Sequence, residues 1–188
     1  PDVACPAGAS TDGAAHDESA LETALKADGA SLSDGVRFGL MGNSLSERGI
    51  TATRDMAENE LLISIPYHAW GTAGDGTRTP TGAKMIQAHR DKRLTAREFS
   101  DLDYLALWIL ESDQTTPYIT SLPSLADLSH VPVFWSDSDR AHLEGTDLYN
   151  ELDGRLRDYE ESYSTIISVA GPTFAESVTL ERWSWAKA

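Results

Sequence analysis

The chain has 188 residues, of which 40% are hydrophobic and 24% charged, which are proportions typical of a globular protein. Its formal net charge of −15 argues against a general nucleic-acid binder, because polyanions are held mainly by lysine and arginine. The length allows one sizeable domain, or one domain with a helical insertion. The acidic charge is compatible with a basic protein substrate, although it can also serve solubility alone.

Cysteine and histidine, the usual ligands of structural zinc, are few. Cys5 is the only cysteine, which excludes a disulfide within these residues and a zinc site built from several cysteines. No run approaches the roughly 20 apolar residues that span a bilayer. We therefore expect no metal site, no membrane segment and no nucleic-acid partner. The five histidines lack the spacing of metal ligands: His16, His68, His89, His130 and His142.

One helix is predicted near the start of the chain. Residues 1–17 are small, polar and turn-forming, and we expect them to be disordered. In residues 19–30, Ser19 and Glu22 have the spacing of a capping box, and Gly29 is a typical C-terminal stop. These signals predict a helix that ends before Gly29.

Strand patterns follow the first helix. Apolar residues alternate in residues 36–40, and further strands are expected at 49–53 and 60–65. Three short strands so close together predict a small antiparallel sheet. Residues 70–84 are rich in glycine and threonine and are predicted to form a loop. They lack the Gly-Lys-Ser/Thr ending of a phosphate-binding loop.

The second half of the chain has a helical period. In residues 95–112, Thr95 and Glu98 form a predicted capping box, and a buried stripe is expected at Leu102, Leu105, Ala106, Ile109 and Leu110. Pro117 is expected to end this segment and to open a turn-rich crossing. A short helix is expected near Ser136. Strands therefore come first and helices dominate later, which indicates an α+β fold.

Two further helices complete the pattern. The longest, residues 147–168, has one predicted apolar face: Leu148, Leu152, Leu156, Tyr159, Tyr163 and Ile166. Gly154 in its middle costs about 1 kcal/mol relative to alanine, which indicates that a close neighbour needs the space. Thr179 is predicted to cap the last helix, in which Glu181 favours the helix dipole.

Motifs with a known catalytic geometry are missing. The sequence has no Gly-x-Ser-x-Gly elbow, no His-Glu-x-x-His and no plausible cysteine–histidine pair. The acidic pairs Asp101/Asp103 and Asp137/Asp139 are interpreted as helix starts and solvated faces. Residue chemistry alone thus indicates an α+β domain with a glycine loop that leads into a small sheet.

The order of the segments resembles one family over residues 19–188. After the helix and the first strand come "ERGITATRDMAENELLISIP", a helical stretch, "PYITSLP", "VPVFWSDSDRAHLEGTDL" and "VTLERWSWA". This order is similar to that of SET-domain methyltransferases of the Rubisco large-subunit lysine methyltransferase type. The actin-histidine methyltransferase and enzymes that modify ribosomal proteins belong to the same type. The resemblance implies an S-adenosylmethionine-dependent enzyme with a protein substrate.

The resemblance also implies a cofactor loop, Ser46, Glu47, Arg48, Gly49 and Ile50. In the family this loop has the form Glu-Gly-x-Gly. Gly49 matches its second glycine, whereas Ser46 and Glu47 replace its glutamate and its first glycine. The loop acts mainly through its backbone, and a glycine allows close approach. The alternative is that Gly49 merely eases the start of a strand.

The division of the chain follows from the same resemblance. Residues 18–70 would form the N-terminal SET strands with their preceding helix, 71–84 a loop, and 85–188 a helical insertion that lines the substrate cleft. The family's later Val-x-Ser-Arg run, Asn-His pair and tyrosine are not in these residues, so we expect a partial chain that is inactive by itself. No catalytic residue is named within it. The alternatives are a non-catalytic interaction module, or a protein-histidine methyltransferase once completed.

Overall fold

The computed structural model describes residues 18–40, 48–93 and 99–188. The expectations for residues 1–17 and for the Thr95–Glu98 capping box lie outside these ranges. The described part is a mixed α+β structure in which helices predominate. The strands are β1 Ser31–Leu32, β2 Val36–Leu40, β3 Arg48–Ala52 and β4 Ile63–Ser64. The α-helices are α1 Glu18–Ala27, α2 Ala73–Gly76, α3 Pro80–Arg90, α4 Asp101–Glu111, α5 Pro117–Ser121, α6 Asp137–Arg140, α7 Asp147–Ala170, α8 Pro172–Ser177 and α9 Leu180–Lys187. The 3-10 turns are η1 Tyr67–Ala69, η2 Asp127–His130, η3 Pro132–Phe134 and η4 Ala141–Leu143.

The strands form two separate antiparallel pairs, and the single small sheet predicted from the sequence is wrong. β1 pairs with β4, and β2 pairs with β3. The chain therefore crosses from one pair to the other twice, between β1 and β2 and again between β3 and β4. β4 is shorter than the predicted strand 60–65 because only Ile63 and Ser64 find partners in the two-residue β1.

Helix α1 ends as predicted but begins differently. Gly29 has a φ of +91°, and its N–H donates to the carbonyl of Lys26, so the glycine stop is confirmed. The helix begins at Glu18, which places Ser19 inside the first turn, and the Ser19–Glu22 capping box is wrong. The Glu22 carboxylate instead accepts a hydrogen bond from the Lys26 ammonium one turn later, at 2.6 Å.

The loop predicted for residues 70–84 is wrong, because this segment contains α2 and the start of α3. Thr72 and Thr79 supply the N-caps, and Asp75 completes a capping box with Thr72. Gly76 is buried where α2 crosses α4. A Cβ at Gly76 would lie 1.8 Å from the carbonyl oxygen of Tyr104, so only glycine permits this approach. Gly76, one of the glycines that indicated a loop, thus serves helix packing.

The core forms where α4, α7 and α9 meet. Its buried side chains are Met85, Tyr104, Ala106, Leu107, Leu110, Ile166, Phe174, Val178 and Trp183. Helix α4 starts at Asp101, with a capping box between Ser100 and Asp103. The predicted stripe is confirmed in part: Ala106 and Leu110 are buried, but the buried face also includes Asp103, Tyr104 and Leu107, and Leu102 is 60% exposed.

Helix α7 follows the predicted pattern only in part. Leu152, Tyr159 and Ile166 are buried, but Leu148 is 47% exposed in the first turn. The expectation of a close neighbour at Gly154 is wrong, because a Cβ there would have no atom within 4 Å. The cap at Thr179 and the short helix after Ser136 are confirmed. The crossing after Pro117 is helical, because Pro117 occupies the first turn of α5.

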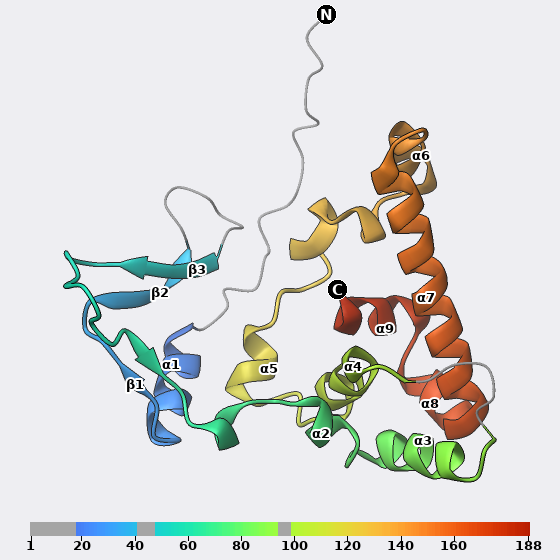
Figure 1. The fold of residues 1–188 in the computed structure, drawn as a ribbon, viewed down its shortest axis with the longest axis horizontal. Coiled ribbons are helices and arrows are strands. Elements are labelled where there is room, and N and C mark those ends of the chain that lie inside the picture. The colour runs from blue at the N-terminus through green and yellow to red at the C-terminus, as the bar shows by residue number, and fades with distance from the viewer. Residues whose placement is uncertain (1–17, 41–47, 94–98) are drawn as a thin grey trace, which may run out of the picture.

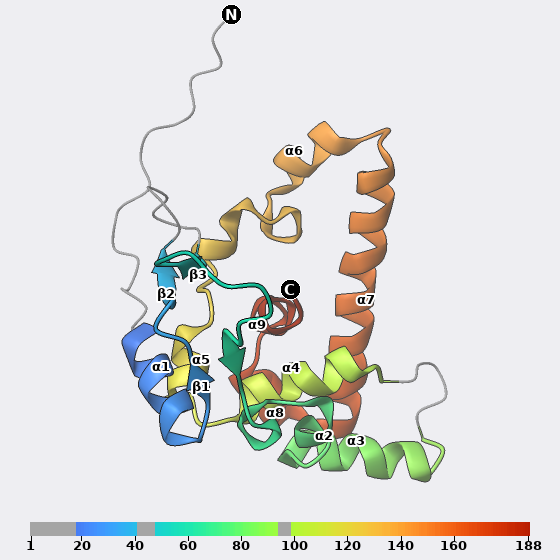
Figure 2. The same cartoon turned by 60° about the vertical axis from the view of Figure 1, so that its left-hand side comes forward.

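The strand pairs and the core helices occupy different parts of the molecule (Figure 1). The β2–β3 hairpin stands at one end, and α7 runs along the opposite edge. Helices α1 and α5 pack together and connect the strand region with the helical region, as the turned view also shows (Figure 2). Helices α4 and α9 lie between α5 and α7.

Candidate functional site

The β2–β3 hairpin carries the described part of the predicted cofactor loop. Gly49 and Ile50 belong to β3, where the register places Gly49 opposite Gly39 and Ile50 opposite Phe38. The structure describes the backbone of Arg48, while Ser46 and Glu47 lie outside the described ranges. The strand predicted at 49–53 is therefore confirmed within one residue. Gly39 was not predicted as part of the site, although a glycine inside an apolar strand often marks a place where a ligand or another backbone approaches closely.

The hairpin is open at Gly39, and both Gly39 and Gly49 are half-buried. Gly39 has a φ of +148°, and a Cβ built there would meet no atom within 4 Å. Two glycines face each other, so backbone is accessible without intervening side chains. Ile50, on the other face, is 48% exposed. These features fit a ligand that is held through main-chain groups.

A polar cluster lies where β3 leaves the hairpin. The Arg54 guanidinium is 2.6 Å from the Glu60 carboxylate and 2.9 Å from the Asp34 carboxylate. Glu60 also accepts the N–H of Ala57 at 3.0 Å. The hydrogen bond from Arg54, followed by that from Ala57, lowers the pKa of Glu60 from 4.5 to about 2. Glu60 is therefore ionised at neutral pH and holds Arg54 in place.

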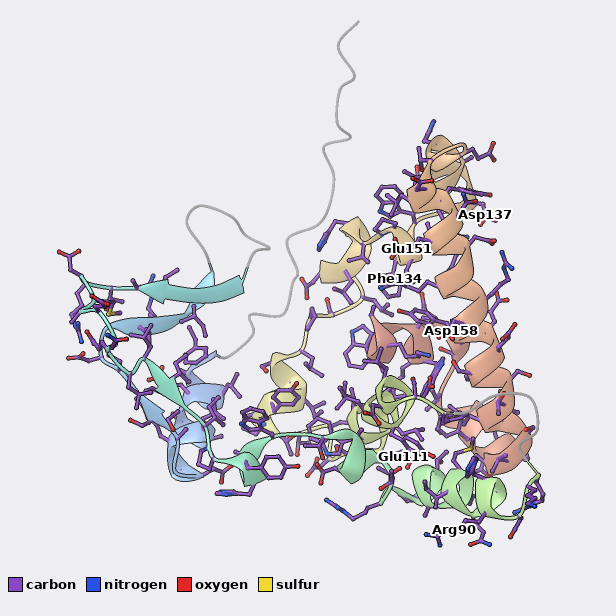
Figure 3. The ribbon with its side chains drawn as sticks, in the orientation of Figure 1. Arg90, Glu111, Phe134, Asp137, Glu151 and Asp158 are labelled. Carbon is purple, nitrogen blue, oxygen red and sulfur yellow. The ribbon has the colours of Figure 1, made fainter. Side chains whose placement is uncertain are left out.

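A second polar cluster, which was not predicted from the sequence, lies between α4, α7 and α9; its Lys187 and Asp103 side chains are buried, and Asp158 is 44% exposed. The Lys187 ammonium lies 2.5 Å from Asp103 and 2.9 Å from Asp158. It is also 5.0 Å from the ring centre of Tyr159. Figure 3 shows Asp158 on the side of α7 that faces α9. The interpretation of Asp103 as part of a solvated face is wrong, because its side chain is 0% exposed.

This buried cluster fastens α9 to the other core helices. The Trp183 indole donates to the hydroxyl of Ser162 at 2.9 Å, and the Tyr159 hydroxyl donates to the carbonyl of Lys187 at 3.2 Å. Every charge is satisfied by a hydrogen bond or an opposite charge, as buried groups require. The cluster is therefore a structural element. Nothing in the sequence around Lys187 predicted that its side chain is buried.

The pair Asp137/Asp139 behaves as predicted at a helix start. Ser136 is the N-cap of α6 and accepts the N–H of Asp139 at 3.2 Å. The Asp137 side chain is 95% exposed and pairs with Arg140. At the far end of α4, Glu111 accepts the N–H of Thr81 at 3.0 Å and thereby caps α3 (Figure 3).

Residues 18–40, 48–93 and 99–188 contain no cluster of three or more histidine, cysteine or acidic side chains placed to hold a metal. Among the helices formed in the same ranges, none combines the length and the apolar character needed to cross a bilayer.

Comparison with known proteins gives one informative similarity. No protein-family model matches the chain. Over 127 residues, or 66% of its length, the chain is 27% identical to "N-lysine methyltransferase setd6" from Xenopus tropicalis. The match covers 27% of that protein, so the chain spans about a quarter of the curated relative it matches. The activity in the relative's name agrees with the methyltransferase class that the order of the segments implied.

Proposed function

We propose that this chain belongs to an S-adenosylmethionine-dependent protein-lysine N-methyltransferase with a SET-type fold. The observation that carries the proposal is the 27% identity to a lysine methyltransferase over two thirds of the chain. The β2–β3 hairpin supports it, because Gly49 stands opposite Gly39, where a Cβ would meet no atom within 4 Å, and lies in the loop that the resemblance implies for the cofactor. The similarity supports methyltransferase function in general. That the cofactor is S-adenosylmethionine and the acceptor a lysine is proposed in addition.

The proposed division of labour follows the two regions of the fold. Residues 18–70, with the hairpin, would contribute one side of the cofactor pocket, and the helices of residues 85–188 would contribute contacts to the protein substrate. The curated relative is several times longer than the matched region, and we propose that residues outside these 188 supply the remaining catalytic groups. The finer family assignment, to the Rubisco and actin-histidine type, is part of the same proposal.

The chain's part in the chemistry would be to bind and align. S-adenosylmethionine supplies an electrophilic methyl group. The backbone of Gly49 and Ile50 would hold the cofactor's amino-acid end, and Ser46, Glu47 and Arg48 would complete this contact. The acceptor lysine has an ordinary pKa of about 10.4 and must be neutral to react, so a partly desolvated channel would favour its uncharged form. Alignment of donor and acceptor would then provide much of the rate enhancement.

A second candidate function is a non-catalytic interaction module. It is favoured by the exposed apolar side chains that precede α2, because such groups often mark protein-binding surfaces. Leu61 is 68% exposed, Tyr67 77% and Trp70 56%. The Tyr67 and Trp70 rings lie 6.3 Å apart, so these two side chains form a local aromatic surface.

The test uses the natural protein, expressed from its own gene, with isotopically labelled S-adenosylmethionine and a lysine-containing protein extract. We expect saturable cofactor binding and labelled methyl-lysine in the products. Gly49→Val should weaken cofactor binding at least about tenfold, because its side chain would occupy the approach to the backbone. Gly154→Ala, at an open position on α7, is the matched control and should bind as the wild type does. Cofactor binding without any methylated product would favour the interaction module, and methyl-histidine would identify the alternative acceptor.

A further inference from the structure

The two strand pairs meet at a junction where the chain crosses between them twice. The first crossing joins β1 to β2, and the second joins β3 to β4. The N–H of Thr53 in the second crossing donates to the carbonyl of Gly35 in the first, at 2.9 Å. The N–H of Ser33 donates to the carbonyl of Leu62, also at 2.9 Å. These bonds bring the two crossings side by side.

Arg54 links both crossings through its guanidinium group. Nη2 is 2.9 Å from Oδ1 of Asp34 in the first crossing and 2.6 Å from Oε1 of Glu60 in the second. Nη1 is 3.2 Å from Oε2 of Glu60, which makes the contact with Glu60 two-pronged. A planar guanidinium bound in this way fixes an angle as well as a distance, which a lysine ammonium does not.

The packing beneath Arg54 is close. Gly35 is buried, and a Cβ there would lie 2.6 Å from Cε of Met56 and 3.0 Å from Cζ of Arg54. Glycine at position 35 therefore lets the Met56 and Arg54 side chains close onto the first crossing. Ser33 adds a hydroxyl that donates to Glu60 at 3.3 Å. The junction is thus held by packing and by an ion-pair network together.

We propose that Arg54 is a positioning residue that sets the orientation of the β2–β3 hairpin, and hence the place of Gly49 and Ile50, relative to the rest of the chain. β3 continues directly into Thr53 and Arg54, so a rotation at the junction is transmitted along the strand. Gly49 lies five residues from Arg54, or roughly 16 Å along an extended chain. A small rotation at the junction therefore displaces Gly49 substantially. The link to cofactor binding rests on the proposed function, whereas the control of hairpin orientation does not.

The experiment compares Arg54→Gln and Arg54→Lys with the wild-type natural protein. Arg78→Gln is the control, because Arg78 is an exposed arginine that pairs with Asp75 away from the junction. Hydrogen exchange and a spin-label distance between the hairpin and α4 report orientation. Binding and turnover assays measure the Kd and the KM for S-adenosylmethionine and, separately, the kcat of methyl transfer.

We expect Arg54→Gln to lose exchange protection at the Thr53 amide and to broaden the distance between hairpin and α4, while amides in α4 and α9 stay protected. Kd and KM for S-adenosylmethionine should rise roughly 10- to 100-fold with a smaller change in kcat, because misplacement of a binding group by about 1 Å can cost that much. Arg54→Lys should show both effects in weaker form than Arg54→Gln does. Arg78→Gln should match the wild type in both measurements. Asp34→Asn keeps the contact between Arg54 and Glu60 and should give a smaller effect of the same sign, so it replaces Arg54→Gln if that variant fails to fold.

Unchanged exchange and distance in Arg54→Gln would overturn the positioning role. A moved hairpin with an unchanged Kd for S-adenosylmethionine would overturn its link to the cofactor. If the wild-type protein binds no S-adenosylmethionine, the proposed function and that link fail together, and the exchange and distance measurements still decide whether Arg54 orients the hairpin.

Discussion

Lys187, in the last turn of α9, forms a buried ion pair with Asp103 in the first turn of α4. The ammonium nitrogen and the carboxylate oxygen lie 2.5 Å apart, and the two side chains are 2% and 0% exposed. The other Asp103 oxygen accepts the N–H and the hydroxyl of Ser100, each at 2.8 Å. One carboxylate thus both caps α4 and binds α9, which couples the start of one helix to the end of another.

Replacing Lys187 with methionine should destabilise the protein by about 3 to 5 kcal/mol, because it leaves Asp103 buried without its opposite charge. Chemical denaturation measures this difference. Lys26→Met removes an exposed lysine that pairs with Glu22, and it should cost no more than about 0.5 kcal/mol. The double variant Asp103→Asn/Lys187→Met should lose less stability than the two single variants lose in sum, because the two removed charges interact. Strict additivity would show that the pair contributes nothing.

The close crossing of α2 and α4 predicts a severe effect at Gly76. Alanine there would place its Cβ 1.8 Å from the Tyr104 carbonyl oxygen, and the backbones would have to separate. We expect a loss of at least about 3 kcal/mol, at the upper end of what overpacking costs. Gly74 lies in the same helix, and a Cβ there would be an ordinary 3.5 Å from its nearest neighbour. Thermal unfolding should therefore separate Gly76→Ala clearly from Gly74→Ala, and equal melting temperatures would contradict this crossing.

Gly154→Ala should stabilise the protein by about 1 kcal/mol, because the site is in mid-helix and has open space around it. The measurement is the denaturant midpoint of the variant against that of the wild type. A lower midpoint would mean that a neighbour occupies the space, as the sequence alone had indicated.

The hairpin junction should weaken in acid. Arg54, and next the N–H of Ala57, lower the folded-state pKa of Glu60 from 4.5 to about 2. The contribution of this carboxylate is therefore complete above about pH 4.5 and is lost as the pH falls toward 2. Exchange protection of the Thr53 amide should follow this loss in the wild type. In Glu60→Gln protection should be low at pH 6 and nearly independent of pH, whereas the exposed Glu58→Gln should behave as the wild type. The same acid response in Glu60→Gln would assign the titration to another group.

Local signals in the sequence predicted elements better than they predicted contacts. Ser136, Thr179 and Gly29 mark helix ends through bonds to neighbouring residues, and all three were readable. By its neighbours in the sequence, Gly76 resembles a loop glycine. Its packing role depends on Tyr104, which is 28 residues away, so the local sequence does not show it. Burial of Lys187 depends in the same way on Asp103, 84 residues earlier. Spacing within a segment carries no information about such partners.

At the candidate site, too, the local element was predictable and the contacts between distant residues were not. The strand that contains Gly49 and Ile50 follows from alternation and a glycine, so it was predictable. Its pairing with Gly39, and the anchoring of the strand by Arg54 on Glu60 and Asp34, depend on register and on two chain crossings. These features emerge only when both strand pairs are assembled.

The most direct test of the methyltransferase proposal is cofactor binding followed by methyl transfer. The natural protein should be titrated with S-adenosylmethionine by calorimetry and then incubated with the labelled cofactor and protein substrates. We predict saturable binding that Gly49→Val weakens at least about tenfold, together with label on lysine side chains. No binding and no labelled lysine from a folded natural protein would contradict the proposed function.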